Sequence, residues 1–141
     1  TRAVTNLLYT GTLNEFPEIR YIINHSGAAV PAMAGRIKDR IPGASSYDAK
    51  PQTDGITPMT PKGVFYELRK LYYECAHAGY PAAMAALMKF APPSQYLFGT
   101  DFPAEDPGNM FKELKETGLP PDIERVMFRE NAEKLFPRFK A

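Results

Sequence analysis

Two short apolar segments are each followed directly by a residue whose side chain is common in active sites. His25 comes after residues 19–24, and Asp101 comes after residues 95–100. A histidine imidazole can bind a metal ion or transfer a proton near neutral pH. A carboxylate behind an apolar strand is costly to bury unless it meets a metal, a proton or a hydrogen-bond donor. We therefore predict a functional site that includes both residues.

Each of these two residues also has a structural alternative. His25 could cap the segment that follows it by donating a hydrogen bond to a backbone carbonyl, and its position leaves both roles open. Asp101 could cap the next loop, where aspartate is common. Its context, Phe-Gly-Thr-Asp-Phe-Pro, favours the functional role.

Four more residues lie near these positions. Glu74 and His77 flank the end of a third apolar segment, and for both we predict a structural role, as a hydrogen-bond partner or a pocket wall. Arg36 is either a surface residue or a clamp that holds a carboxylate through two hydrogen bonds. Cys75 is expected to be buried in the segment, and we assign it no nucleophilic role.

The elements that must position these residues alternate between helices and strands. Apolar residues at helical spacing predict helices, short runs rich in β-branched and aromatic residues predict buried strands, and prolines mark the boundaries. The predicted helices span 2–15, 31–40, 61–69, 81–91, 107–117 and 122–136; the predicted strands span 19–24, 70–76 and 95–100; residues 42–60 form an exposed loop.

This alternation predicts an α/β fold, one domain over residues 1–141, with about three parallel strands and flanking helices. In such folds function gathers at the carboxyl ends of the strands. Three strands cannot close a barrel and leave open edges. We therefore expect more sheet to come from a missing N-terminal segment, a second chain or an oligomer. The start at Thr1, inside an expected helix, favours a piece of a longer protein.

Composition argues against several classes of function. The 17 basic and 16 acidic residues are mixed along the chain, without the Lys/Arg block of a nucleic-acid or membrane-surface binder. A single cysteine precludes an intrachain disulfide and fits a reducing compartment. The apolar runs are too short to span a bilayer, and we expect no signal peptide. We expect a soluble, cytoplasmic protein.

Three stretches resemble the amidohydrolase-2 family of metal-dependent amidohydrolases. They are TGTLNEFPEIRYIINHSGAAVPAMAGRI, ELRKLYYECAHAGYPAAMAALMKFAPPSQYLFGTDFP and ERVMFRENAEKLFPR, and together they cover nearly the whole chain. The resemblance implies the C-terminal part of a TIM-type (β/α)₈ barrel. The family contains aminocarboxymuconate-semialdehyde, resorcylate and 6-methylsalicylate decarboxylases and several hydrolases.

The resemblance also implies roles for three residues. The family's decarboxylases hold one divalent metal, usually zinc with manganese as the alternative, at the mouth of the barrel. By motif, Asp101 matches an aspartate ligand of that metal, and His25 matches a histidine that acts as a general acid/base. Arg36 matches an arginine that, in some relatives, crosses a dimer interface to hold the substrate carboxylate.

This sequence departs from the family pattern in two ways. The family's His-x-His pair and its fifth-strand histidine have no counterpart here, so this chain alone cannot supply a four-ligand site. The glycines that usually follow the histidine are replaced by Ser26-Gly27-Ala28, which narrows the turn and affects the substrate pocket.

The leading hypothesis is a metal-dependent, non-oxidative decarboxylase, a carbon–carbon lyase, of a small aromatic or unsaturated carboxylic acid. The metal would polarise or anchor the substrate, or activate a water. One alternative is a metal-dependent hydrolase of a lactone or an amide. Another is a non-catalytic barrel fragment that needs complementation. The expected macromolecular partner is a second copy in a homodimer or a complementing N-terminal segment.

Overall fold

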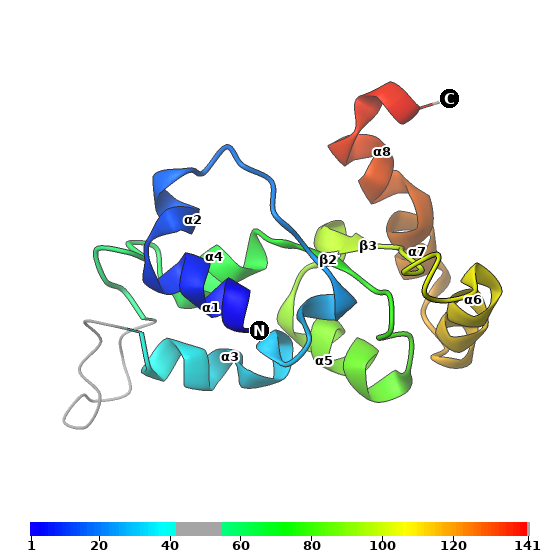
Figure 1. Cartoon of the computed structure of the whole chain (residues 1–141), viewed down its shortest axis with the longest axis horizontal. Coiled ribbons are helices and arrows are strands. Elements are labelled where there is room, and N and C mark those ends of the chain that lie inside the picture. Colours follow the sequence, from blue (N-terminus) through cyan, green and yellow to red (C-terminus); the bar gives the residue numbers. More distant parts are fainter. Residues whose placement is uncertain (42–54, 141) are drawn as a thin grey trace.

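Three short parallel strands lie at the centre of the molecule. The structure, a computed structural model, describes residues 1–41 and 55–140. The strands are β1 (Ile22–Ile23), β2 (Tyr72–Glu74) and β3 (Tyr96–Leu97), in the order β1-β2-β3 (Figure 1). The predicted number of strands and their parallel direction are confirmed, although each strand is shorter than predicted. Among the described residues β1 and β3 each pair with β2 and with no other strand. Each of them therefore has one edge without a strand partner in this part of the chain.

Helices connect the strands, as the alternating pattern predicts. α3 (Val30–Asp39) and α4 (Val64–Arg69) lie between β1 and β2. α5 (Pro81–Phe90) and a 3₁₀ turn at Pro93–Gln95 lie between β2 and β3. Pro81 opens α5 as predicted, because proline is well suited to the first turn of a helix.

The expected exposed loop at 42–60 is only partly described. Residues 42–54 lie outside the described residues. For residues 55–60 the prediction is wrong at Gly55, Thr57 and Thr60, which are buried, and right at Ile56 and Pro58, which are exposed. The hydroxyls of Thr57 and Thr60 are 3.0 Å apart, and the Thr60 hydroxyl donates to the Gly55 carbonyl. The polar composition of this segment predicts exposure. The threonine hydroxyls can nevertheless be buried because they form hydrogen bonds within the turn.

The predicted helix at 2–15 is two helices. α1 (Arg2–Tyr9) ends before α2 (Thr12–Glu15) begins, and Gly11 between them has φ 79°. Glycine adopts this left-handed conformation at little steric cost, and it turns the chain between the two helices. Val4 and Leu8 of α1 and Leu13 of α2 are buried.

The C-terminal helices leave the sheet in a separate arm (Figure 1). They are α6 (Pro107–Glu116), α7 (Pro121–Arg125) and α8 (Asn131–Leu135), with a π-helical turn at Val126–Glu130 and a final 3₁₀ turn at Pro137–Phe139. The prediction of a continuous helix over 122–136 missed the wider π turn. Asn131 fastens this arm to the sheet, since its Nδ2 donates to the carbonyls of Pro93 and Tyr96, each at 2.8 Å.

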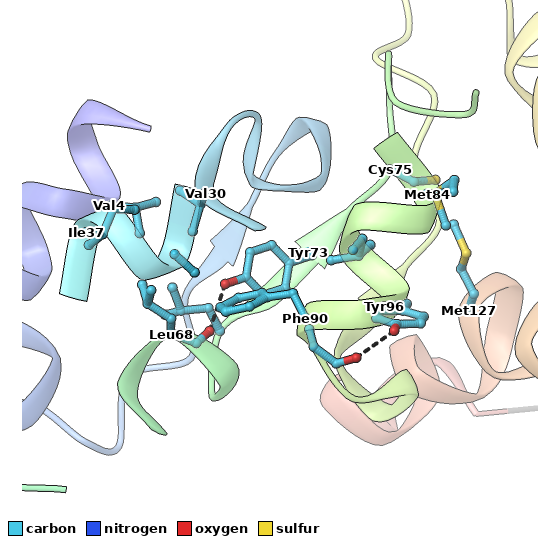
Figure 2. Packing of buried hydrophobic residues seen from close by; sticks show 14 of the residues in the cluster. Val4, Val30, Ile37, Leu68, Tyr73, Cys75, Met84, Phe90, Tyr96 and Met127 are labelled. Atoms are coloured by element: carbon cyan, nitrogen blue, oxygen red, sulfur yellow. Dashed lines mark hydrogen bonds between the residues drawn. The ribbon is translucent and has the colours of Figure 1, made fainter. Parts of the chain in front are cut away.

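The hydrophobic core lies between the helices and one face of the sheet (Figure 2). Tyr73 and Tyr96 pair across β2 and β3 and are both fully buried. Each phenol donates to a backbone carbonyl near the end of the preceding helix, that of Leu68 at 2.7 Å and that of Ala91 at 2.6 Å. These bonds satisfy the buried hydroxyls and tie each strand to the helix before it.

The opposite face of the sheet is exposed at β1 and buried at Leu97 of β3. Side chains alternate between the two faces of a strand, so Ile22 and Tyr72 point away from the helices. Ile22 is 44% exposed, which contradicts the expectation of a strand buried on both faces. Among the described residues no helix is both long enough and apolar enough to cross a membrane.

Candidate active site at the carboxyl ends of the strands

Three loops meet at the carboxyl edge of the sheet. His25 begins a 3₁₀ turn two residues after β1, His77 lies three residues after β2, and Asp101 lies four residues after β3. Because the strands are parallel and adjacent, their ends face the same side of the molecule. Both residues predicted to carry out chemistry therefore lie at one edge, together with a histidine assigned only a structural role.

His77 lies between the other two side chains. Its Nε2 is 3.0 Å from Oδ2 of Asp101. Its ring packs edge-on against the ring of His25, with centroids 5.3 Å apart and planes at 70°. The structure thus brings His25 and Asp101 together through His77.

The hydrogen bonds assign a tautomer to each imidazole. Nδ1 of His25 is 2.9 Å from the carbonyl oxygen of Ala76. A carbonyl only accepts, so Nδ1 carries the hydrogen, and in the neutral ring the lone pair lies on Nε2. By the same reasoning Nε2 of His77 donates to the carboxylate of Asp101. The structural alternative, a cap on the segment that follows His25, is wrong, because the bond reaches the loop after β2 and no described side chain caps α3. The bond leaves Nε2 of His25 available for chemistry.

The backbone at this edge is strained. Among the described residues, those other than glycine with positive φ are His25, Ser26, Ala28, His77 and Asp101, with φ between 51° and 61°. All five lie in the three loops that follow the strands. A side chain in this left-handed region costs on the order of 1–3 kcal/mol, and such residues cluster at functional sites. The three candidate side chains are therefore aimed by backbone conformations that the rest of the fold must stabilise.

Two glycines make room beneath the loops. A Cβ on Gly27 would lie 2.8 Å from the ring of Tyr73, and φ at Gly27 is 78°. A Cβ on Gly99 would lie 1.9 Å from Oε1 of Glu74. The turn after His25 and the end of β3 can therefore approach their neighbours only because these positions lack a side chain.

Glu74 and Cys75 have structural roles, as expected. Oε1 of Glu74 accepts a hydrogen bond from the amide of Ala76, which braces the loop carrying His77. Glu74 follows the inward-facing Tyr73, so its side chain lies on the opposite face of the sheet rather than among the helices. Cys75 is fully buried, and this burial raises the pKa of its thiol to about 12, which keeps it protonated and unreactive near neutral pH.

Arg36 lies apart from this cluster. It is in the last turn of α3, and its side chain is exposed. The described residues give it no hydrogen bond or ion pair with His25, His77 or Asp101. Its predicted role with a substrate carboxylate stays a prediction.

The donor set fits one side of a metal site. Asp101 is 43% exposed and offers a carboxylate oxygen that His77 does not occupy, and His25 offers Nε2. Over residues 1–41 and 55–140, however, no three His, Cys, Asp or Glu side chains are grouped to hold a metal ion. Carboxylate and imidazole are ligands suited to zinc and manganese, and a complete site needs donors beyond the described residues.

Sequence reasoning assigned chemistry to two of the three clustered side chains and predicted a structural hydrogen bond or a pocket wall for His77, which does make a hydrogen bond, to Asp101. His77 lies in a loop after a strand, as His25 does, and this position was the available signal. Residue type favours a histidine as the donor to a carboxylate, but the spacing does not say that His77 reaches Asp101.

Comparisons with known proteins identify the family of this chain. The profile of the Amidohydrolase family matches residues 1–138. The 6-methylsalicylic acid decarboxylase of Penicillium expansum is 30% identical over 142 residues, which cover 99% of this chain and 41% of that protein. The decarboxylase yanB of Aspergillus niger is 27% identical over 146 residues, covering 99% of this chain and 37% of that protein.

A solved structure shows the same fold. The dihydroxybenzoic acid decarboxylase of Polaromonas sp. JS666, with bound manganese and the inhibitor 2-nitroresorcinol, superposes with a TM-score of 0.76 at 19% identity. The match covers 97% of this chain and 39% of that one. The three strands and their helices thus correspond to part of a TIM-barrel decarboxylase, which confirms the predicted fold class.

The chain spans about two-fifths of the length of the curated relatives it matches. Its family follows from a profile match over nearly all of its residues, and its relatives include decarboxylases. The chain belongs to the Amidohydrolase family.

Proposed function

We propose that the protein carrying this chain is a metal-dependent, non-oxidative decarboxylase of a small aromatic or unsaturated carboxylic acid. The observation that supports this most strongly is the convergence of His25 and Asp101 at one edge of the sheet, joined by His77. The named activities of the homologous Penicillium and Aspergillus proteins support the same reaction class.

Asp101 would hold the divalent metal, zinc or manganese, together with donors outside the described residues. When bound, the metal would supply a positive charge that anchors and polarises the substrate. Asp101 is suited to this role because its carboxylate is partly exposed and is oriented by a hydrogen-bond donor.

His25 would move the proton. In decarboxylation the bond from the carboxyl carbon to the substrate breaks, CO₂ leaves, and the electron pair stays on the substrate carbon, which then takes a proton. A protonated His25 can donate that proton from Nε2, because Nδ1 keeps its own hydrogen on the carbonyl of Ala76. The neutral ring that results is the tautomer the structure favours.

Arg36 would orient the substrate carboxylate from across a homodimer interface. Its exposed position on α3 places it outside the local cluster, as a role in a second subunit requires. A guanidinium can hold a carboxylate with two parallel hydrogen bonds, which fixes its orientation.

The test uses the full-length protein, with metal content measured by elemental analysis before any metal is added. CO₂ release is then followed with 6-methylsalicylate and 2,6-dihydroxybenzoate as probes. We expect His25→Ala to lower kcat by at least about 10²-fold while the metal content is retained. Loss of metal in His25→Ala would make His25 a ligand and overturn the division of roles.

A second assay separates the reaction classes. Acid release from lactones or amides, without CO₂ from any carboxylic acid, would replace the decarboxylase with a hydrolase. A full-length protein that binds no metal and performs neither reaction would overturn both enzymatic proposals.

A further inference from the structure

His77 lies where it can act on both groups of the proposed site. Its Nε2 donates to Oδ2 of Asp101 at 3.0 Å, and its ring contacts the ring of His25. The two imidazoles come from the ends of adjacent strands and the carboxylate from the end of the third. No other described side chain is hydrogen-bonded to the Asp101 carboxylate.

The backbone conformation at His77 is unusual and fixes the direction of its side chain. His77 has φ 53°, the left-handed conformation also found at His25 and Asp101. The loop is held from beneath, since the carboxylate of Glu74 accepts from the amide of Ala76 and the carbonyl of Ala76 accepts from His25. A strained residue that persists at a braced loop points to a role for its side chain.

A purely stabilising role does not explain the contact. The side chains of His77 and Asp101 are 45% and 43% exposed, and ion pairs between exposed groups contribute little to stability. A hydrogen bond that orients a metal-binding carboxylate contributes to metal affinity instead. Removing the residue that bonds to a metal ligand commonly weakens metal binding about 10–100-fold.

We propose that His77 is a positioning residue for the metal site. It holds Oδ2 of Asp101 so that the other carboxylate oxygen faces the metal, and its ring sets the separation between that carboxylate and His25. This inference rests on the proposed function only in assigning a divalent metal to Asp101.

The experiment measures the Kd of Mn²⁺ for the full-length protein after its metal has been stripped, with the metal alone as the probe. We expect His77→Ala to raise that Kd by about 10–100-fold. His77→Gln keeps an N–H donor at a similar reach, and we expect it to stay within about fivefold of the wild type. Tyr80→Ala is the matched control in the same loop, and we expect its Kd to change by about twofold at most, because Tyr80 is 53% exposed and does not bond to Asp101.

The unfolding temperature in EDTA separates positioning from structural support. We expect His77→Ala to change it by only about 2 °C, because the pair is half exposed. The proposal is overturned if His77→Ala binds Mn²⁺ within about twofold of the wild type. It is equally overturned if His77→Ala and His77→Gln lose the same affinity and both unfold much earlier.

Failure of this inference is distinguishable from failure of the proposed function. A wild-type protein that releases CO₂, with an unchanged Kd in His77→Ala, would keep the decarboxylase and refute the role of His77. A protein whose Mn²⁺ affinity depends on His77 but which decarboxylates no acid would do the reverse.

Discussion

Replacing Gly99 with alanine should disturb the edge of the sheet that carries the site. The new Cβ would lie 1.9 Å from Oε1, 2.4 Å from Cδ and 2.6 Å from Cγ of Glu74. Three atoms of one side chain are too close at once, so a shift of a few tenths of an ångström cannot relieve the overlap. The carboxylate of Glu74 must move and give up its hydrogen bond from the amide of Ala76.

The magnitude follows from three contributions. A hydrogen bond to a charged group contributes about 1.5–3 kcal/mol, which partial exposure of Glu74 reduces to roughly 1–2 kcal/mol. Forcing the side chain from its rotamer costs about 1 kcal/mol. Gly99 does not have positive φ, so alanine meets no left-handed strain there and restricts the unfolded chain, which returns about 0.4–1 kcal/mol. The net destabilisation for Gly99→Ala is therefore about 1–3 kcal/mol.

A double-mutant cycle identifies the cause. Glu74→Ala removes the obstacle, so adding Gly99→Ala to that variant should leave the free energy of unfolding unchanged or raise it by up to about 1 kcal/mol. Glu74→Gln is the matched control, because it keeps the length of the side chain and therefore the overlap. In that background Gly99→Ala should again destabilise by about 1–3 kcal/mol.

The assay is urea unfolding of the full-length protein, with the midpoint and slope compared across the variants. The reasoning is refuted if Gly99→Ala destabilises equally in the wild-type and Glu74→Ala backgrounds. In that case the Glu74 side chain is not what excludes a Cβ at position 99.

Two further predictions concern the core and pH. Asn131→Asp keeps the side-chain volume but removes both hydrogen bonds to the carbonyls of Pro93 and Tyr96. It should lower the free energy of unfolding, measured in urea, by about 2–4 kcal/mol. A loss under about 1 kcal/mol would contradict the anchoring role of Asn131. Burial raises the pKa of the Cys75 thiol from 9.0 to about 12 and that of the Tyr96 phenol from 10.0 to about 12. The unfolded state then ionises first, so this stabilisation is complete below about pH 9 and is lost as the pH rises toward 12. The free energy of unfolding should fall over that window, and less steeply in Cys75→Ala; equal slopes would contradict the burial of the thiol.

The family resemblance and the apolar pattern were sufficient to predict most of the architecture from the sequence. Apolar runs such as that before His25, and prolines such as Pro81, placed the strands and the starts of helices, because burial and restricted φ are local consequences of residue type. Local signals were weaker where backbone conformation decided the outcome. Gly11 divided a predicted helix, and Val126–Glu130 widened into a π turn.

The candidate site divides in the same way. The sequence by itself determined that His25 and Asp101 each follow a strand, and a parallel sheet then requires them to share an edge. Only the tertiary structure decided that the His77 side chain reaches Asp101, because this contact depends on a φ of 53° at His77 and on a loop braced by Glu74. Side-chain direction at a loop is set by contacts between residues distant in the chain, and residue type alone does not encode it.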